Sequence, residues 1–107
     1  MSQIELYALG EKLVQMRLLD QTQVDQALTS LGRSGSSPDA LLNELESRNL
    51  LTTYQVSRIR KGEWDELVLG DYKLMYQNAS GSFARVFRAA SVVDGTIVGV
   101  KELRQRW

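Results

Sequence analysis

The chain has 107 residues, enough for one compact domain or two very small ones. Hydrophobic residues make up 43% and charged residues 24%, which is typical of a folded globular chain and not of a disordered one. Lys and Arg balance Asp and Glu, so no net charge favours nucleic acid or an anionic membrane. Neither Cys nor His occurs, which excludes disulfides and every catalytic or metal site that needs a thiol or an imidazole.

The apolar runs are too short to span a membrane, and the first residues lack the basic start and apolar core of a signal peptide. We therefore expect a soluble cytoplasmic protein, with no membrane segment and no nucleic-acid partner for this part of it. The chain changes character near Trp64, where a helical pattern gives way to an alternating one. This predicts an α+β fold with a helical module over residues 1–63 and a strand-rich region over residues 66–107.

The helical half contains an internal repeat. A shift of 32 residues, which brings Leu13 onto Leu45, also superimposes two Leu-Leu pairs and two Gln-Val pairs. Each copy predicts a helical hairpin whose second helix opens with a capping box, formed by Asp20 with Gln23 and by Thr52 with Gln55. Four short helices are expected, at residues 3–17, 20–32, 38–48 and 52–62.

The linker between the two copies ends in Ser37 and Pro38, which suit the N-cap and first position of the third helix. The charged residues of residues 1–63 are scattered as on solvated helix faces and do not converge on a site. We interpret this half as a docking or regulatory module that binds protein partners.

The second half predicts a three-stranded antiparallel meander with strands at residues 72–76, 83–90 and 96–103. Small polar residues 77–82 form the first turn, and Val93-Asp94-Gly95-Thr96 forms a tight hairpin because Asp-Gly accommodates positive φ angles. On the third strand, Gly99 and Lys101 share one face, while Val98, Val100 and Glu102 share the other.

Residues 67–107 resemble the start of a protein kinase domain, as found in bacterial serine/threonine kinases of the eukaryotic type. The run Ala79-Ser80-Gly81-Ser82-Phe83-Ala84-Arg85-Val86 is similar to the family's G-x-G-x-x-G-x-V loop, with Ala79 and Ala84 in place of two glycines. Val98-Gly99-Val100-Lys101 is similar to its V-A-I-K strand. The helical prelude, which ends in residues 51–55 and Gly62, also looks like the region ahead of the kinase domain in some of these proteins.

The resemblance implies a nucleotide-binding edge for ATP with Mg²⁺ in the parent protein. The loop backbone would approach phosphate, Val86 and Gly99 would face the adenine, and Lys101 would present its ammonium to the α- and β-phosphates. The implied nucleotide-binding residues are Ala79, Ser80, Gly81, Ser82, Phe83, Val86, Gly99 and Lys101.

The family's catalytic H-R-D and metal-binding D-F-G motifs do not occur in the 107 residues, so we assign no catalytic or metal-binding residue here. The chain is expected to be an inactive fragment of a kinase on its own. A pseudokinase and a protein-interaction or scaffold module, in which Lys101 is an ordinary surface residue, remain as alternatives. Apolar residues such as Leu67 and Phe87 are candidates for an exposed surface on the sheet, which the chain can hide by packing the sheet on the helices or by pairing strands with a second copy. We favour a homo-oligomer formed through exposed strands.

Overall fold

The computed structural model describes residues 3–32, 37–81 and 83–103. It is an α+β protein whose chain forms two compact units, residues 1–51 and residues 52–107, which we name the helix unit and the strand unit. The predicted fold class is confirmed at that level. The sequence places the boundary near Trp64, whereas the units divide between Leu51 and Thr52, because the fourth helix packs against a strand.

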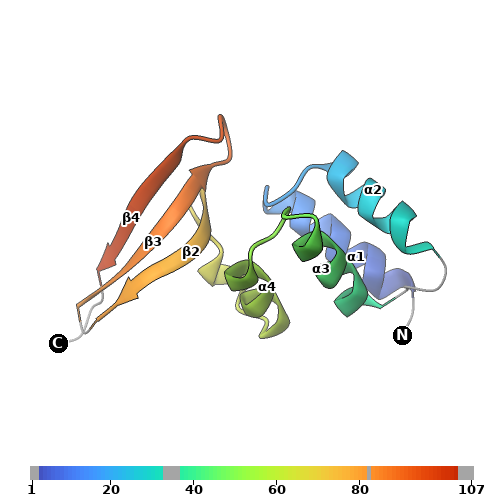
Figure 1. The fold of residues 1–107 in the computed structure, drawn as a ribbon, viewed down its shortest axis with the longest axis horizontal. Helices are drawn as coiled ribbons and strands as arrows, with labels where there is room; N and C mark the ends of the chain where they lie inside the picture. Colours follow the sequence, from blue (N-terminus) through green and yellow to red (C-terminus); the bar gives the residue numbers. More distant parts are fainter. Residues whose placement is uncertain (1–2, 33–36, 82, 104–107) are drawn as a thin grey trace. The chain divides into compact units, whose positions relative to one another are not determined.

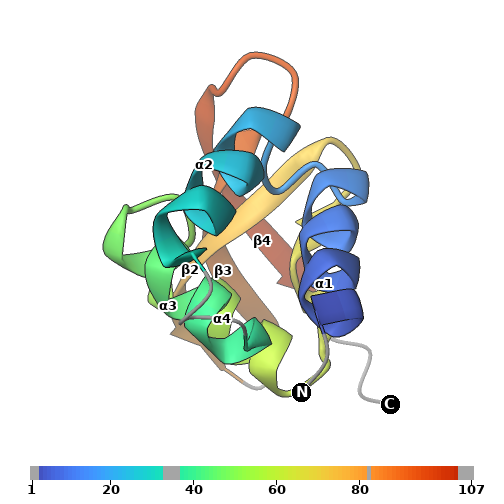
Figure 2. The same ribbon diagram turned by 90° about the vertical axis from the view of Figure 1, so that its right-hand side faces the viewer.

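The helix unit consists of α1 (Gln3–Gln15), α2 (Gln21–Leu31) and α3 (Pro38–Ser47), and each of these helices contacts the other two (Figure 2). Ser37 caps α3 as predicted, since its hydroxyl accepts a hydrogen bond from the N–H of Ala40 at 3.0 Å. The core of this unit is aliphatic. Its buried side chains are Leu6, Leu13, Leu18, Leu19, Val24, Ala27, Leu41, Leu42, Leu45 and Leu51.

The predicted repeat is present in the backbone. Arg17 and Asn49, which are 32 positions apart, both have φ of 61° and reverse the chain after α1 and α3. The carbonyl of Leu13 accepts hydrogen bonds from the next Leu-Leu pair, and the carbonyl of Leu45 does the same in the second copy. Both predicted capping boxes are also formed, at the starts of α2 and α4.

The strand unit begins with α4 (Thr53–Arg60) and a short 3-10 helix, η2 (Trp64–Glu66). A four-stranded antiparallel sheet follows in the order β1-β2-β3-β4, so each strand pairs with the next along the chain. Its strands are β1 (Val68–Leu69), β2 (Tyr72–Ser80), β3 (Ala84–Ser91) and β4 (Ile97–Leu103). The meander of three strands was predicted correctly, and the two-residue β1 was missed because it is too short to show alternation.

The lengths of strand β2 and of the β3–β4 connection differ from the prediction. β2 runs to Ser80, and irregularities in its pairing follow Leu74 and Gln77, so most of the predicted turn at residues 77–82 is strand. The β3–β4 connection spans residues 92–96 and is longer than the predicted tight hairpin. Within it, Gly95 has φ of 76°, and the N–H of Thr96 donates to the carboxylate of Asp94, which lowers the pKa of that carboxyl.

One face of the sheet is covered by α4, as Figure 1 shows, and we name it the covered face. Its core consists of Leu74, Phe87 and Ala89, with Tyr54 of α4 packed against them. The ring centroids of Tyr54 and Phe87 are 5.7 Å apart in an edge-to-face arrangement. Leu67 and Phe87, which the sequence makes candidates for an exposed surface, are therefore not exposed, because both are fully buried. No helix in the described ranges has the length and apolar character that crossing a membrane requires.

Candidate functional site

The second face of the sheet carries four of the residues implied by the kinase resemblance, and we name it the open face. Val86 pairs directly with Ala79 on one side and with Lys101 on the other, and paired residues in antiparallel strands project to the same face. Gly99 lies two positions before Lys101 and therefore shares this face. Among the described elements of the strand unit, no helix covers the open face (Figure 1).

The bend between β2 and β3 lies at one end of the open face. It is closed by a hydrogen bond of 2.9 Å from the N–H of Gly81 to the carbonyl of Ala84. Phe83 in this bend is 70% exposed, while Ser80 pairs with Arg85 and so projects to the covered face. Ser82 lies outside the described residues. Of the predicted loop residues, Ala79 thus shares the face of Lys101, and Ser80 does not.

The packing of the chain does not explain why position 99 is a glycine. Its φ lies outside the left-handed region, and a Cβ built on it would meet no atom within 4 Å. Glycine in the middle of a strand weakens the strand and often marks a place where another molecule approaches the backbone closely. A small hollow of about 130 Å³ lies here, and its lining residues are Asn78, Arg88, Ile97, Val98 and Gly99.

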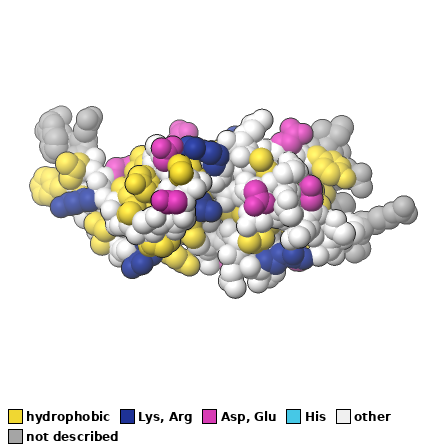
Figure 3. Space-filling model, turned by 90° about the horizontal axis from the view of Figure 1, so that it is seen from above, with side chains coloured by type: hydrophobic (Ala, Val, Ile, Leu, Met, Phe, Trp, Pro, Cys, Tyr) yellow, Lys and Arg dark blue, Asp and Glu magenta, His cyan; other side chains and the backbone are white. Residues whose placement is uncertain are grey.

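Two cationic side chains lie in this region: Arg88 lines the hollow, and Lys101 is two positions along β4 from Gly99. Arg88 pairs with Gly99 across the sheet, so its side chain and that of Lys101 project to the same face. Within the described part of the chain, neither side chain has an ion-pair partner. None of the paired strand residues on this face, so far as the structure describes them, is acidic. Figure 3, which views the chain from above, shows hydrophobic, basic and acidic side chains side by side on the visible surface of the strand unit.

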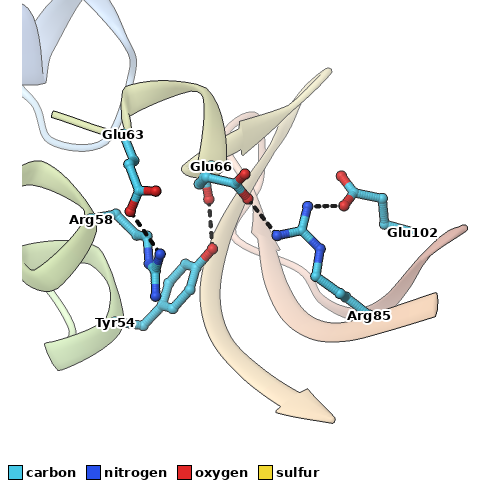
Figure 4. A network of polar contacts seen from close by, with 6 residues as sticks. All are labelled: Tyr54, Arg58, Glu63, Glu66, Arg85 and Glu102. Atoms are coloured by element: carbon cyan, nitrogen blue, oxygen red, sulfur yellow. Dashed lines mark hydrogen bonds and ion pairs between the residues drawn. The ribbon is translucent and has the colours of Figure 1, made fainter. Parts of the chain in front are cut away.

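On the covered face, in contrast to the open face, the cationic side chain of Arg85 is paired with carboxylates. Arg85 donates one hydrogen bond to Glu66 of η2 at 2.7 Å and another to Glu102 of β4 (Figure 4). The hydrogen bond to Glu102 is the largest cause of a raised pKa for the Arg85 guanidinium. The single charge of this arginine is therefore fully compensated by two carboxylates.

Tyr54 and Arg58 of α4 extend the polar contacts of the covered face. The hydroxyl of Tyr54 donates to the carbonyl of Glu66 at 2.8 Å, and Arg58 pairs with Glu63 at 2.7 Å (Figure 4). Burial, followed by the negative charge of Glu66, raises the pKa of the Tyr54 phenol. Together these contacts join α4 to η2 and to Glu63, the residue before it.

Three features of the strand unit were not predicted from the sequence: the position of Arg88 on the open face and two side-chain hydrogen bonds from α4 and its cap to strand β2. Arg88 could have been found from strand alternation, since it lies two positions after Val86. The bond from Gln55 Nε2 to the carbonyl of Leu74, at 3.0 Å, and the bond from the Thr52 hydroxyl to Met75 gave no signal. They depend on which surface α4 contacts, and the capping motif alone does not indicate it.

The open face combines cationic side chains with an exposed stretch of strand backbone. Lys101 and Arg88 supply charge, and the bare backbone at Gly99 admits close approach. In the described ranges, no group of three or more acidic, His or Cys side chains could hold a metal ion. Comparison with known proteins adds no assignment, since no family model, no curated protein and no solved structure matches the chain.

Proposed function

We propose that the strand unit is the nucleotide-binding edge of a bacterial eukaryotic-like serine/threonine protein kinase. One observation carries this proposal: Ala79, Val86, Gly99 and Lys101 all project from the open face, with the Gly81–Ala84 bend at one end of it. An unrelated meander with an ordinary surface lysine gives no reason for these residues to share a face, nor for a glycine at position 99.

In this proposal the nucleotide lies across β3 and β4. Gly99 and Val86 contact the base, Lys101 binds the α- and β-phosphates, and the N–H groups of the bend approach the phosphate chain. Mg²⁺ arrives with ATP, because the open face contributes no carboxylate to hold it in the described strands. Phosphoryl transfer also needs a metal-holding Asp and a catalytic Asp, and the D-F-G and H-R-D motifs that carry them in the family do not occur in the 107 residues.

A titration with MgATP followed by amide NMR tests the site. We expect weak binding, with a Kd on the order of 1 mM, because the strand unit provides one side of a nucleotide-binding cleft. Shifts should concentrate at Gly81, Val86, Gly99 and Lys101, and Lys101→Met should abolish them. Lys61→Met, which removes an exposed lysine at the end of α4, is the matched control and should bind as the unchanged protein does.

Two results would contradict the site assignment. One is the absence of chemical-shift changes up to about 10 mM MgATP, because a site with the expected Kd of about 1 mM would be largely occupied at that concentration. The other is a set of shifts confined to α4 and the covered face. The coding sequence beyond Trp107 tests the family assignment separately: acidic residues in H-R-D and D-F-G motifs support an active kinase, and their replacement supports a pseudokinase.

The homo-oligomer that the sequence predicts has a specific basis in the strand unit. β4 is an edge strand of the described sheet, and Tyr76, Ile97 and Leu103 are each about half or more exposed on the open face. We propose that a second copy pairs along β4, while the helix unit binds a protein partner. Light scattering should detect a dimer, and Ile97→Lys, which places a charge on an exposed position of the edge strand, is expected to weaken it. A clean monomer at high concentration would contradict the pairing.

A further inference from the structure

Arg85 lies at the edge of the candidate site, next to the bend between β2 and β3. It lies directly between Ala84, which closes the bend, and Val86, which projects from the open face. Its own side chain projects to the covered face, since it pairs with Glu102 and Ser80. The residue therefore has its backbone in the nucleotide-binding edge and its guanidinium on the far side of the sheet.

The guanidinium joins segments that are distant in sequence. One Nη atom donates to Glu66 of η2 at 2.7 Å, and the other donates to Glu102 of β4 (Figure 4). The guanidinium also lies 5.4 Å from the centroid of the Phe87 ring. Planar guanidinium groups hold two carboxylates in a fixed geometry that an ammonium cannot reproduce. Arg85, Glu66 and Glu102 thus form one partly buried cluster, which we name the Arg85 clamp.

The clamp acts on both halves of the candidate site. Glu102 is the neighbour of Lys101 in β4, so fixing Glu102 also fixes the strand that presents the ammonium. Arg85 adjoins the bend, for which the structure gives one closing hydrogen bond, from Gly81 to Ala84. Removing the guanidinium would leave two carboxylates close together without compensation, and their repulsion would push η2 and β4 apart.

We propose that Arg85 is a positioning residue for the nucleotide-binding face, acting from the opposite side of the sheet through Glu66 and Glu102. This inference rests on the proposed function for its ligand. Arg85 itself does not contact the nucleotide in this proposal, because its side chain lies on the covered face. Its effect is to pre-order the bend and the Lys101 strand, so that a ligand does not have to order them on binding.

The clamp is also connected to α4. The backbone carbonyl of Glu66 accepts the Tyr54 hydroxyl at 2.8 Å, and the Tyr54 ring packs edge-to-face on Phe87. A helix that covers one face of the sheet is thereby linked, through η2 and Arg85, to the order of the bend. Loss of the Tyr54 hydroxyl is expected to act on the bend in the same direction as loss of Arg85, and more weakly.

The test compares Arg85→Gln with Arg58→Gln. Arg58 is a close match, since it also pairs with a glutamate at 2.7 Å and lies 5.4 Å from an aromatic ring centroid, yet it is on α4. Amide exchange with water is measured at Gly81, in the bend, and at Val92, whose N–H donates to the carbonyl of Asp71 at 2.8 Å and involves no residue of the clamp. Arg85→Gln should accelerate exchange at Gly81 about tenfold more than at Val92, whereas Arg58→Gln should change both alike.

MgATP titrations on the same proteins give the second readout. Arg85→Gln should weaken binding about fivefold under conditions where the protein is fully folded, and Arg85→Lys should recover part of that loss. Equal acceleration at Gly81 and Val92 with unchanged ATP affinity would overturn the inference, because the residue would then be merely stabilising. If the unchanged protein does not bind ATP at all, the proposed function fails, and the Gly81-to-Val92 exchange ratio still decides whether the clamp orders the bend.

Discussion

The second helices of the two repeat copies, α2 and α4, open with the same local structure. In α2, the N–H of Gln23 donates to the Asp20 carboxylate at 2.8 Å, and the N–H of Asp20 donates to the Gln23 side chain at 2.9 Å. In α4, Thr52 and Gln55 form the same reciprocal pair at 3.1 and 2.9 Å. Yet α2 contacts the helices of the helix unit, and α4 contacts strand β2.

The difference lies in the donors that remain after capping. Gln55 is buried, and its Nε2 donates to the carbonyl of Leu74, while the Thr52 hydroxyl donates to the carbonyl of Met75 at 2.6 Å. An aspartate at the cap can only accept hydrogen bonds, so Asp20 could not make the second bond that Thr52 makes. The capping box therefore begins both helices, and in α4 the remaining donors of Thr52 and Gln55 bond to strand β2.

Gln55→Ala should give the largest effect in this comparison. It removes the reach-back bond, leaves the Leu74 carbonyl without its side-chain donor and opens space in a buried region, at a cost of about 3 kcal/mol of unfolding free energy. Gln23→Ala removes one bond near the surface and should cost about 1 kcal/mol or less. Urea denaturation followed by Trp fluorescence measures the first variant, because both tryptophans belong to the strand unit. Equal costs for the two variants would contradict the comparison.

Exchanging the two caps tests the donor argument directly. Thr52→Asp keeps an acceptor for the capping box but faces the Met75 carbonyl with a carboxylate, so we expect a loss of about 2 kcal/mol. Asp20→Thr exchanges one good cap for another and should change the unfolding free energy by less than about 0.5 kcal/mol. Thr52→Ser, which retains the hydroxyl, is the control and should behave nearly as the unchanged protein. Circular dichroism during urea denaturation checks all three.

Tyr54 provides a pH-dependent version of the same contrast, since the equivalent position in α2 is Thr22. The pKa of Tyr54 is raised above its usual value of 10.0, so the folded strand unit favours the neutral phenol. That contribution is complete below pH 10 and is lost as the pH rises through the higher folded-state pKa. Tyr54→Phe should cost about 1 kcal/mol at neutral pH through loss of the bond to Glu66, and should remove this part of the alkaline destabilisation. Denaturation curves at pH 8 and above 10 would show an unchanged alkaline slope if the assignment is wrong.

The smallest effect is expected at the turns that the two copies share. Arg17 and Asn49 are both exposed with φ of 61°, a conformation that glycine adopts at no steric cost. Arg17→Gly should stabilise the helix unit by about 0.5–1 kcal/mol, and Asn49→Gly by less, because asparagine already tolerates this region. Thermal denaturation followed by circular dichroism measures both, and an equal or reversed order would show that side-chain contacts of Arg17 outweigh the backbone term.

These comparisons also show where reasoning from the sequence succeeds. The caps and the repeat were predictable because they depend on residues three or four positions apart, and the faces of β4 were predictable from alternation. The assignment of α4 to the strand unit was not, because Gln55 looks the same in a cap whether its Nε2 meets water or Leu74. In the candidate site, Gly99 and Lys101 followed from alternation, whereas the Arg85 clamp depends on η2, which has too few residues to give a periodic signal.

The sequential order of the strands has a consequence for how the strand unit forms. Because β1, β2, β3 and β4 each pair with the next strand along the chain, every pairing requires the closure of a short loop. Such a topology has a low contact order for a β-rich unit, which favours folding at the faster end of the range for such proteins. The hairpin that presents Lys101 opposite Val86 can therefore assemble as a local event during synthesis, without waiting for any distant part of the polypeptide.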